Sequence, residues 1–183
     1  MKIRTFLALE LPQTVREKLS VHAELTSGND KLKQIRWLPK ENYHLTLAFL
    51  GNVEHVLISS LKLKLKQIFS SEQTVPIRFI EITPFPFSGT PRIAAAMLEH
   101  SDELMQLQQN TAKCVCSFGI SLERRRFTPH VTLGRLKSRS RKSIAFQPQQ
   151  IFLEGVLEKL VIFESDLTSK GAVYTSRGEI SWV

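Results

Sequence analysis

The chain has 183 residues, 42% of them hydrophobic and 23% charged, which is typical of one folded domain rather than a disordered or fibrous protein. Its formal net charge of +8 favours a polyanionic partner, such as nucleic acid or an anionic membrane, over a neutral ligand. No apolar run is long enough to cross a membrane, the first residues lack the features of a signal peptide, and Cys114 and Cys116 match no disulfide framework or zinc pattern. We therefore expect a cytoplasmic protein with no membrane association, and we expect both thiols to pack on a helix.

The first half of the chain predicts strands that alternate with helices. Residues 3–9 are apolar and β-favouring and predict a strand, and Pro12 suits the first turn of a helix that residues 27–30 end. Two further strands and a second helix are predicted at residues 35–37, 43–50 and 56–69. The last of these segments also alternates like a strand, but its length favours a helix.

The second half continues this mixture. Four strands are predicted at residues 77–82, 92–98, 130–136 and 157–163. Apolar residues at helical spacing from Leu104 to Phe118 predict a helix that Gly119 ends. The element order predicts an α+β fold with largely antiparallel sheets. No low-complexity linker divides the chain, so we expect one domain over residues 1–183.

One short pattern occurs twice. His44-Leu45-Thr46-Leu47 recurs as His130-Val131-Thr132-Leu133, each on a predicted strand. Because side chains alternate across a strand, the histidine and threonine of each copy share one face, and the apolar residues pack on the other. The two side chains lie roughly 7 Å apart along the strand, which is close enough for both to touch one phosphate group.

These residue types suit the cleavage of a phosphodiester without a metal. The reaction needs a base on the attacking oxygen and an acid on the leaving oxygen, on opposite sides of the phosphorus. Two imidazoles that titrate near neutral pH can divide these roles, and the hydroxyls of Thr46 and Thr132 can hydrogen-bond the phosphoryl oxygens. The repeat therefore predicts a two-histidine phosphoesterase with His44 and His130 as the acid–base pair.

The chain resembles the 2H phosphoesterase superfamily, and within it the RNA 2′,3′-cyclic phosphodiesterases once called 2′-5′ RNA ligases. The matching blocks lie in order along nearly the whole chain, at residues 4–12, 35–37, 41–51, 91–92, 126–135 and 164–167, with Gly171 and Tyr174 after them. Gly134 departs from the alanine that many members have, but it keeps a small residue there.

The resemblance implies a bilobal fold with two pseudo-symmetric lobes, whose antiparallel sheets flank a central groove. It also implies hydrolysis of a 2′,3′-cyclic phosphate to a 2′-phosphomonoester, with no metal and no cofactor. By the same resemblance, His44 is the proton donor to the departing 3′ oxygen, His130 is the proton acceptor that activates water, and Thr46 and Thr132 hold the phosphoryl oxygens. RNA with a 2′,3′-cyclic phosphate end, or a cyclic nucleotide, is then the expected partner of a monomeric enzyme.

Three alternatives stay open at this point. The same histidines can run the reverse reaction, in which a 2′-5′ RNA ligase joins a cyclic phosphate end, as on tRNA halves, to a 5′ hydroxyl. A noncatalytic RNA-binding module would use the histidines only to contact phosphate, although retention of both His-x-Thr motifs argues against it. A two-histidine metal site is disfavoured because neither motif has a carboxylate at matching spacing and three ligands are usual.

Other charged and aromatic residues near the motifs carry weaker predictions. We expect Arg126 to contact the substrate phosphate, and we expect Arg135 to point away from His130 because the strand alternates. The basic run 137–142 could hold an RNA backbone, although a solvated loop accounts for it as well. Three aromatic residues could stack on an unpaired base, although core packing is the simpler expectation for Phe85, Phe87 and Phe127.

Overall fold

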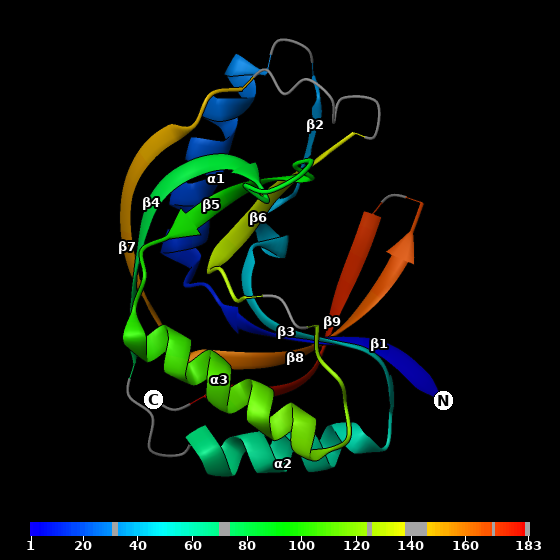
Figure 1. Ribbon diagram of the computed structural model, residues 1–183. Coiled ribbons are helices and arrows are strands. Elements are labelled where there is room, and N and C mark those ends of the chain that lie inside the picture. The colour runs from blue at the N-terminus through cyan, green and yellow to red at the C-terminus, as the bar shows by residue number, and fades with distance from the viewer. Residues whose placement is uncertain (31–32, 70–73, 124–125, 138–145, 170, 182–183) are drawn as a thin grey trace.

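A computed structural model of the protein describes residues 1–30, 33–69, 74–123, 126–137, 146–169 and 171–181 (Figure 1). Three α-helices lie at α1 (Gln13–Asn29), α2 (Leu57–Phe69) and α3 (Asp102–Ser117), and a short 3₁₀ helix at η1 (Lys40–Asn42). The strands are β1 (Lys2–Glu10), β2 (Ile35–Trp37), β3 (His44–Glu54), β4 (Val75–Phe85), β5 (Ile93–Leu98), β6 (His130–Leu136), β7 (Gln149–Leu157), β8 (Lys159–Thr168) and β9 (Gly171–Ser181).

The strands form an antiparallel sheet in the order β7-β4-β5-β6-β3-β1-β8-β9, and β2 pairs with β6 beside this path. Four strands lie on each side of the junction between β6 and β3, so the order itself has a twofold pattern about that junction. Figure 1 shows the two halves as separate lobes, with β4, β5 and β6 in one and β1, β8 and β9 in the other. The predicted α+β fold with two pseudo-symmetric lobes is confirmed.

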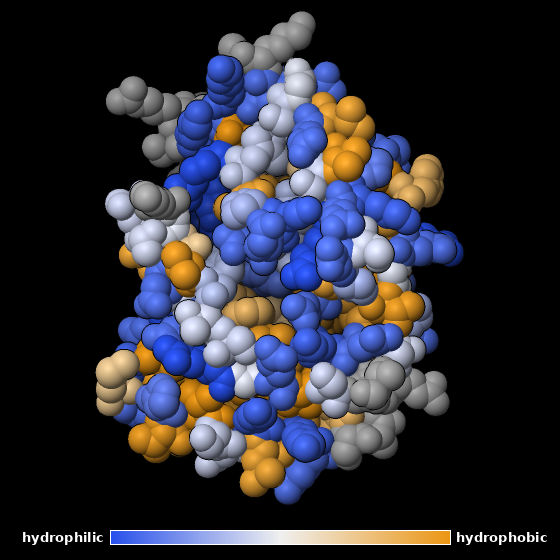
Figure 2. Space-filling view, turned by 180° about the vertical axis from the view of Figure 1, so that it is seen from behind, coloured by the Kyte–Doolittle hydropathy of each residue, from blue (hydrophilic) through white to orange (hydrophobic). Residues whose placement is uncertain are grey.

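Helices pack against each half of the sheet. Helix α1 contacts β7 and β2, whereas α2 contacts β9 and α3 contacts β3, so each lobe has its own helical layer (Figure 1). Seen from behind, the upper part of the surface is mostly hydrophilic and hydrophobic residues gather towards the lower end, where α2 and α3 lie (Figure 2). In the described part of the chain, no helix is long and apolar enough to cross a membrane.

The central strands contain the longest apolar runs of the sequence, as full burial requires. Leu7, Ala8 and Leu9 of β1 have no exposed surface, and neither do Ala94 and Ala96 of β5. Each strand lies inside the sheet, with a hydrogen-bonded neighbour on both edges. Because both faces are buried, polar and apolar residues do not alternate along these strands. A short, continuous apolar run is instead the pattern that indicates a fully buried strand.

Two strands are absent from the sequence prediction. Neither β7 nor β9 was expected, and the strand predicted at 157–163 is in fact β8, which begins after Leu157 and extends to Thr168. Both missed strands lie at the edges of the sheet. In β9 only Gly178 and Ile180 are buried, so its sequence carries almost no hydrophobic period.

Local chemistry explains where α3 begins and ends. The hydroxyl of Ser101 accepts a hydrogen bond from the backbone N–H of Leu104, and the chain turns out of the helix at Gly119, whose φ is +74°. The two cysteines near its end differ: Cys114 is buried and Cys116 is exposed. The expectation that both thiols pack is therefore wrong for Cys116, because residues two apart on a helix face different directions.

Strand β2 lies very close to β6 at Gly134. The pair Trp37–Gly134 belongs to this ladder, and a Cβ atom on Gly134 would lie 2.4 Å from Cγ2 of Ile35 and 3.3 Å from the carbonyl oxygen of Arg36. The Cγ2 atom belongs to a branched side chain that is stiff at χ1, so it cannot rotate away at low cost. Glycine is therefore needed here for a close approach of two strands.

We predict that Gly134→Ala lowers the free energy of unfolding by about 1–3 kcal/mol, the usual cost of overpacking a tight interior. Urea denaturation monitored by circular dichroism measures this change. Gly28→Ala is the matched control, because a Cβ there meets nothing within 4 Å and the residue lies inside α1, so its stability should stay the same or rise. A Gly134→Ala protein as stable as the original would contradict the close approach.

Candidate active site

The two His-x-Thr strands meet at a single backbone pair. Leu45 on β3 pairs with Val131 on β6 in an antiparallel ladder, and both side chains are fully buried. No other β3–β6 pair is found in the described residues, and each strand otherwise pairs within its own lobe. Extending this register by one residue on either side sets the four polar motif residues in two facing pairs, His44 with Thr132 and Thr46 with His130.

In this register the histidine of each motif faces the threonine of the other. The four side chains lie on the same face, opposite to that of Leu45 and Val131, because residues alternate along a strand. Each histidine is diagonal to the other, and diagonal neighbours lie about 7–8 Å apart, while the threonines occupy the other diagonal. A phosphate group placed at the centre would have an imidazole on each of two sides and a hydroxyl on each of the other two.

A backbone irregularity lies at the last residue of each motif. In the β1–β3 ladder Leu7 pairs with Ala48 and Ala8 pairs with Thr46, so Leu47 is left without a partner. In the β5–β6 ladder the pairs at Gly134 and Thr132 likewise leave Leu133 without a partner. Each extra residue is a β-bulge, and it reverses the alternation of the strand beyond it.

The bulges bring one more residue of each strand onto the motif face. Phe49 follows His44 by five positions and Arg135 follows His130 by five, and both are exposed and line the same cleft. The expectation that Arg135 points away from the His130 face is therefore wrong. Regular alternation was assumed from Val131 to Arg135, and the bulge at Leu133 breaks it.

The motif face opens into a cleft of about 500 Å³ between the lobes. Its walls come from several strands and include Arg4, Phe6, His44, Thr46, Phe49, Thr132, Arg135, Ser165 and Tyr174. His130 lies beside this volume rather than in its wall, yet its charge acts on His44. The cleft therefore brings together one histidine and both threonines, with the second histidine at its margin.

Each imidazole is anchored in the same way. Nδ1 of His130 lies 2.8 Å from the carbonyl oxygen of Thr128, and His44 makes a hydrogen bond to the backbone of Asn42. In both cases the partner precedes the histidine by two residues. A carbonyl oxygen only accepts, so Nδ1 of His130 carries the proton and Nε2 is free to exchange one with a ligand.

Burial makes both imidazoles weak bases. The pKa of His44 is lowered from 6.5 to about 4, mainly by burial and to a smaller extent by the positive charges of Arg135 and His130, against the opposing effect of the Asn42 hydrogen bond. Burial also lowers the pKa of His130, partly opposed by its bond to Thr128. Without a ligand both rings are neutral at pH 7, and an anion in the cleft would favour the protonated form of either.

Aromatic rings enclose the histidines and account for this burial. The ring of His44 lies 4.9 Å from that of Phe6 and 5.1 Å from that of Tyr174, which meets it edge-on. On the other side, the ring of Phe85 lies 4.7 Å from that of His130. Phe87 is largely exposed and packs edge-on against Phe85, so core packing is wrong for Phe87.

Two hydroxyls and two arginines of the cleft wall have no partner among the described residues. Neither Thr46 nor Thr132 has a hydrogen-bond partner for its hydroxyl among the described residues, and both residues belong to the cleft wall. Arg4 and Arg135 line the same wall, and within the described chain neither forms an ion pair. The cleft therefore offers two hydroxyls and two positive charges to an anion, and Glu123 is the carboxylate among its described lining residues.

The remaining predicted contacts lie outside this wall. Arg126 is exposed in the segment 126–129 before β6 and is not among the cleft-lining residues. Lys137 is exposed and donates a hydrogen bond to the carbonyl oxygen of Lys33, and residues 138–142 of the basic run lie outside the described part of the chain. In the described ranges, no three His, Cys, Asp or Glu side chains group as metal ligands would.

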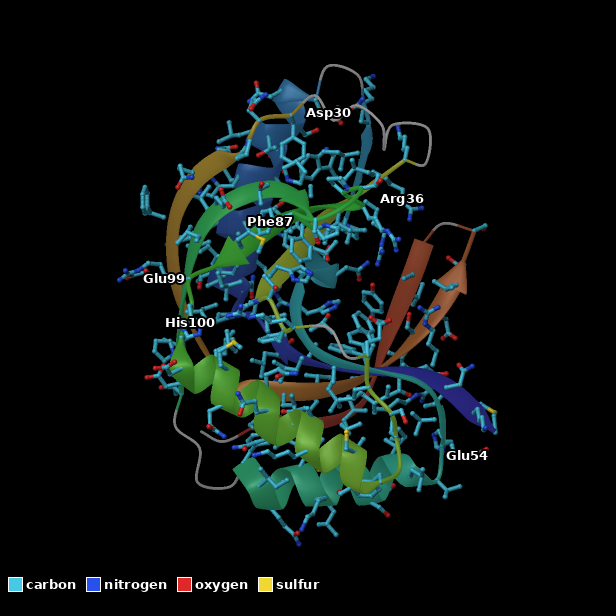
Figure 3. All side chains as sticks on the ribbon, viewed as in Figure 1. Asp30, Arg36, Glu54, Phe87, Glu99 and His100 are labelled. Atoms are coloured by element: carbon cyan, nitrogen blue, oxygen red, sulfur yellow. The ribbon has the colours of Figure 1, made fainter. Side chains whose placement is uncertain are left out.

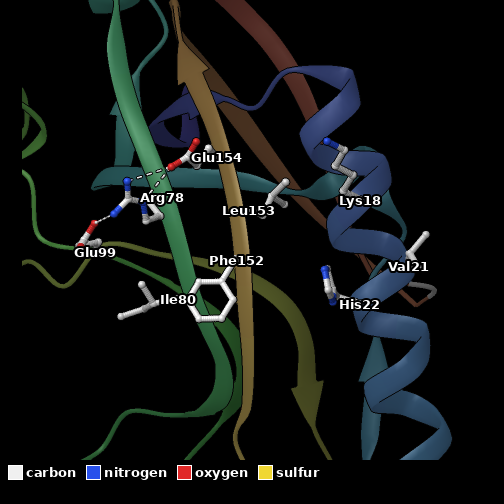
Figure 4. Close-up of a pocket in the computed structure, with 9 residues that line it drawn as sticks. All are labelled: Lys18, Val21, His22, Arg78, Ile80, Glu99, Phe152, Leu153 and Glu154. Atoms are coloured by element: carbon white, nitrogen blue, oxygen red, sulfur yellow. Dashed lines mark hydrogen bonds and ion pairs between the residues drawn. The ribbon is translucent and has the colours of Figure 1, made fainter.

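A second pocket, of about 700 Å³, lies between α1 and the outer side of β4 and β7 (Figure 4). Its arginine, Arg78, is paired with Glu99 at 3.3 Å and with Glu154 at 2.9 Å. The charges of that pocket therefore compensate one another, and its single histidine, His22, has no hydroxyl or second imidazole beside it among the lining residues. It lacks the groups for acid–base chemistry that the cleft provides.

Comparison with known proteins agrees with this geometry. The model of the LigT-like phosphoesterase family matches residues 9–94 and 97–174. The RNA 2′,3′-cyclic phosphodiesterases of Thermotoga maritima and Methanocaldococcus jannaschii are 29% and 28% identical to the chain, covering 94% of it in each case and 91% and 96% of their own lengths. The crystal structure of TT0787 of Thermus thermophilus superimposes with a TM-score of 0.85 at 26% identity over 98% of both chains. The chain belongs to the LigT-like phosphoesterase family.

Proposed function

We propose that this protein is an RNA 2′,3′-cyclic phosphodiesterase, which hydrolyses a cyclic phosphate end to a 2′-phosphomonoester. The observation that carries the proposal is the crossed arrangement of two histidines and two threonines around the Leu45–Val131 pair. The names of the relatives from Thermotoga maritima and Methanocaldococcus jannaschii support the same activity. All four groups come from one chain, which supports a monomer as the catalytic unit.

The geometry suggests how the bonds rearrange. His130 takes a proton from water as the water oxygen attacks phosphorus, and the bond from phosphorus to the 3′ oxygen breaks on the opposite side. His44 gives its proton to that oxygen, which leaves a 3′ hydroxyl and a 2′-phosphate. The hydroxyls of Thr46 and Thr132 donate hydrogen bonds to the two non-bridging oxygens while charge develops on them.

The surroundings of the motif favour a nucleotide over a simple phosphodiester. Phe49 is 62% exposed although it lines the cleft, and Arg135 stands at the equivalent position of the other lobe. Unpaired bases of RNA stack on aromatic rings and on the plane of an arginine side chain. We propose that the ring of Phe49 and the plane of Arg135 hold the terminal base, which leaves the N–H groups at the edge of Arg135 free to bind a phosphate, while the cyclic phosphate lies between the histidines.

The first test is the reaction itself in the presence of EDTA. Because two imidazoles supply both proton transfers, we expect adenosine 2′,3′-cyclic phosphate to be hydrolysed at an unchanged rate when metals are chelated. Phosphorus NMR separates the 2′- and 3′-phosphate products, and we expect the 2′ isomer. Activity that disappears in EDTA and returns with zinc or manganese would overturn the two-histidine mechanism.

Substitutions should separate the roles of the motif residues. We expect His44→Ala and His130→Ala each to lower kcat/KM by about 10²- to 10⁴-fold, the usual contribution of a proton-transfer group. Thr46→Val and Thr132→Val remove a neutral hydrogen bond, so their losses should be on the order of tenfold to a hundredfold. The double histidine variant should fall short of the multiplied single losses because the pair acts as a unit.

The control for these variants is His100→Ala, because His100 is exposed just before α3 and does not line the cleft (Figure 3). It should keep full activity, and thermal melts should show that all variants fold. Normal turnover by a folded His130→Ala protein would instead show that His130 is not the proton acceptor and would overturn the role of the second motif.

The lowered pKa values predict an acidic optimum. The reaction needs one histidine protonated and the other neutral, and burial holds the pKa of His44 at about 4 and that of His130 below its usual value. We expect kcat/KM, which reports the free enzyme, to be bell-shaped with both limbs below about pH 6.5. Bound phosphate stabilises imidazolium, so the profile of kcat should lie at higher pH. A kcat/KM that rises steadily to pH 10 would indicate attack by hydroxide instead.

A further inference from the structure

Two arginines face each other across the β2–β6 ladder. Arg36 pairs directly with Arg135, and Ile93 of β5 pairs with Arg135 from the other side. Directly opposed residues of antiparallel strands point to the same face, so Arg36 shares the face on which Arg135 lines the cleft. In Figure 3, Arg36 projects from β2 on the side of the molecule where the β8–β9 hairpin lies.

This pair carries two positive charges, and neither side chain has an acidic partner among the described residues. Both side chains are exposed, and neither forms an ion pair within the described residues. Like charges directly opposite in a sheet destabilise it. Arg78 differs from both arginines, because it forms ion pairs with two glutamates, Glu99 and Glu154 (Figure 4). An anion bound between Arg36 and Arg135 would remove the repulsion.

The position of the pair relative to the motif suggests which anion this is. Beyond the bulge, Arg135 lies about 7 Å along β6 from Thr132, and Arg36 lies about 5 Å further across the sheet. The pair therefore lies beyond the motif along β6, to one side of the phosphate that lies between the histidines. It is close enough to hold a second phosphate on the same short ligand.

We propose that Arg36, together with Arg135, binds the phosphate on the 5′ side of the terminal nucleotide, so that the enzyme prefers RNA ends to cyclic mononucleotides. The inference rests on the proposed function and names the substrate that the same cleft selects. A phosphodiester carries one negative charge and two free oxygens, and an arginine side chain can donate to both oxygens at once. Arg36 is thus a specificity residue that need not touch the reacting atoms.

The test compares three substrates: adenosine 2′,3′-cyclic phosphate, the same nucleotide with a 5′-phosphate, and the dinucleotide ApA with a 2′,3′-cyclic phosphate end. We expect the 5′-phosphate alone to raise kcat/KM about tenfold, as one charged hydrogen bond at an exposed site allows, and the dinucleotide to keep that gain. The kcat/KM of the second or third substrate, divided by that of the first, should fall to about one in Arg36→Gln. In Arg36→Lys this ratio should fall only partly.

Lys66→Gln is the matched control, because it removes the same charge from α2, which lies at the far end of the other lobe (Figure 1). This variant should keep the preference of the original protein. The inference is overturned if Arg36→Gln keeps the increase in kcat/KM that the 5′-phosphate gives. It is also overturned if kcat/KM falls by the same factor for all three substrates.

A binding measurement keeps the two proposals separable. Fluorescence anisotropy with a labelled tetranucleotide that ends in a 2′-phosphate should give a salt dependence of log Kd whose slope is smaller by about 0.7 in Arg36→Gln, the value for one contact to a single strand. Lys66→Gln should leave the slope unchanged. If the protein hydrolyses none of the three substrates, the proposed function fails, yet the slope still decides whether Arg36 contacts phosphate. An unchanged slope in a folded Arg36→Gln protein would show that it does not.

Discussion

The backbone pair between Leu45 and Val131 joins β3 to β6, and the geometry of the cleft depends on it. Both residues are fully buried, so their apolar side chains fix which face of each strand points to the interior. A slip of one residue on either strand would turn its histidine and threonine into the core. The hydrophobic core thus specifies the register that brings His44, Thr46, His130 and Thr132 to one surface.

The enclosure of the histidines matches the charge of the proposed ligand. Phe6 and Tyr174 on one side and Phe85 on the other keep water from the rings, which makes the imidazolium form costly in the free protein. The aromatic rings carry no negative charge to stabilise imidazolium, and a bound phosphate group supplies one. Among the described residues, no carboxylate contributes to the pKa shift of either histidine. We therefore expect the site to bind anions in preference to neutral molecules of the same size.

Much of this arrangement can be read from the sequence because it depends on local alternation. The repeat places histidine and threonine on one face, and the buried runs in β1 and β5 indicate central strands. The failures have physical causes. Arg135 was assigned to the wrong face because the bulge at Leu133 depends on pairing with β5, a tertiary feature. Tyr174 belongs to an edge strand that lacks a hydrophobic period, so alternation does not predict its contact with His44, and only the family resemblance includes it.

The near-symmetry of the lobes has a consequence for the direction of ring opening. A 2′,3′-cyclic phosphate presents two ester oxygens that are almost equivalent about phosphorus, and the four motif groups are themselves almost equivalent about the Leu45–Val131 pair. The repeated residues alone therefore cannot distinguish cleavage at the 3′ oxygen from cleavage at the 2′ oxygen. The distinction must come from positions at which the lobes differ, of which Phe49 and Arg135 are the clearest, one an aromatic ring and the other a cation at the same place after the bulge. The choice between the 2′ and the 3′ oxygen thus depends on the residues at which the two lobes differ.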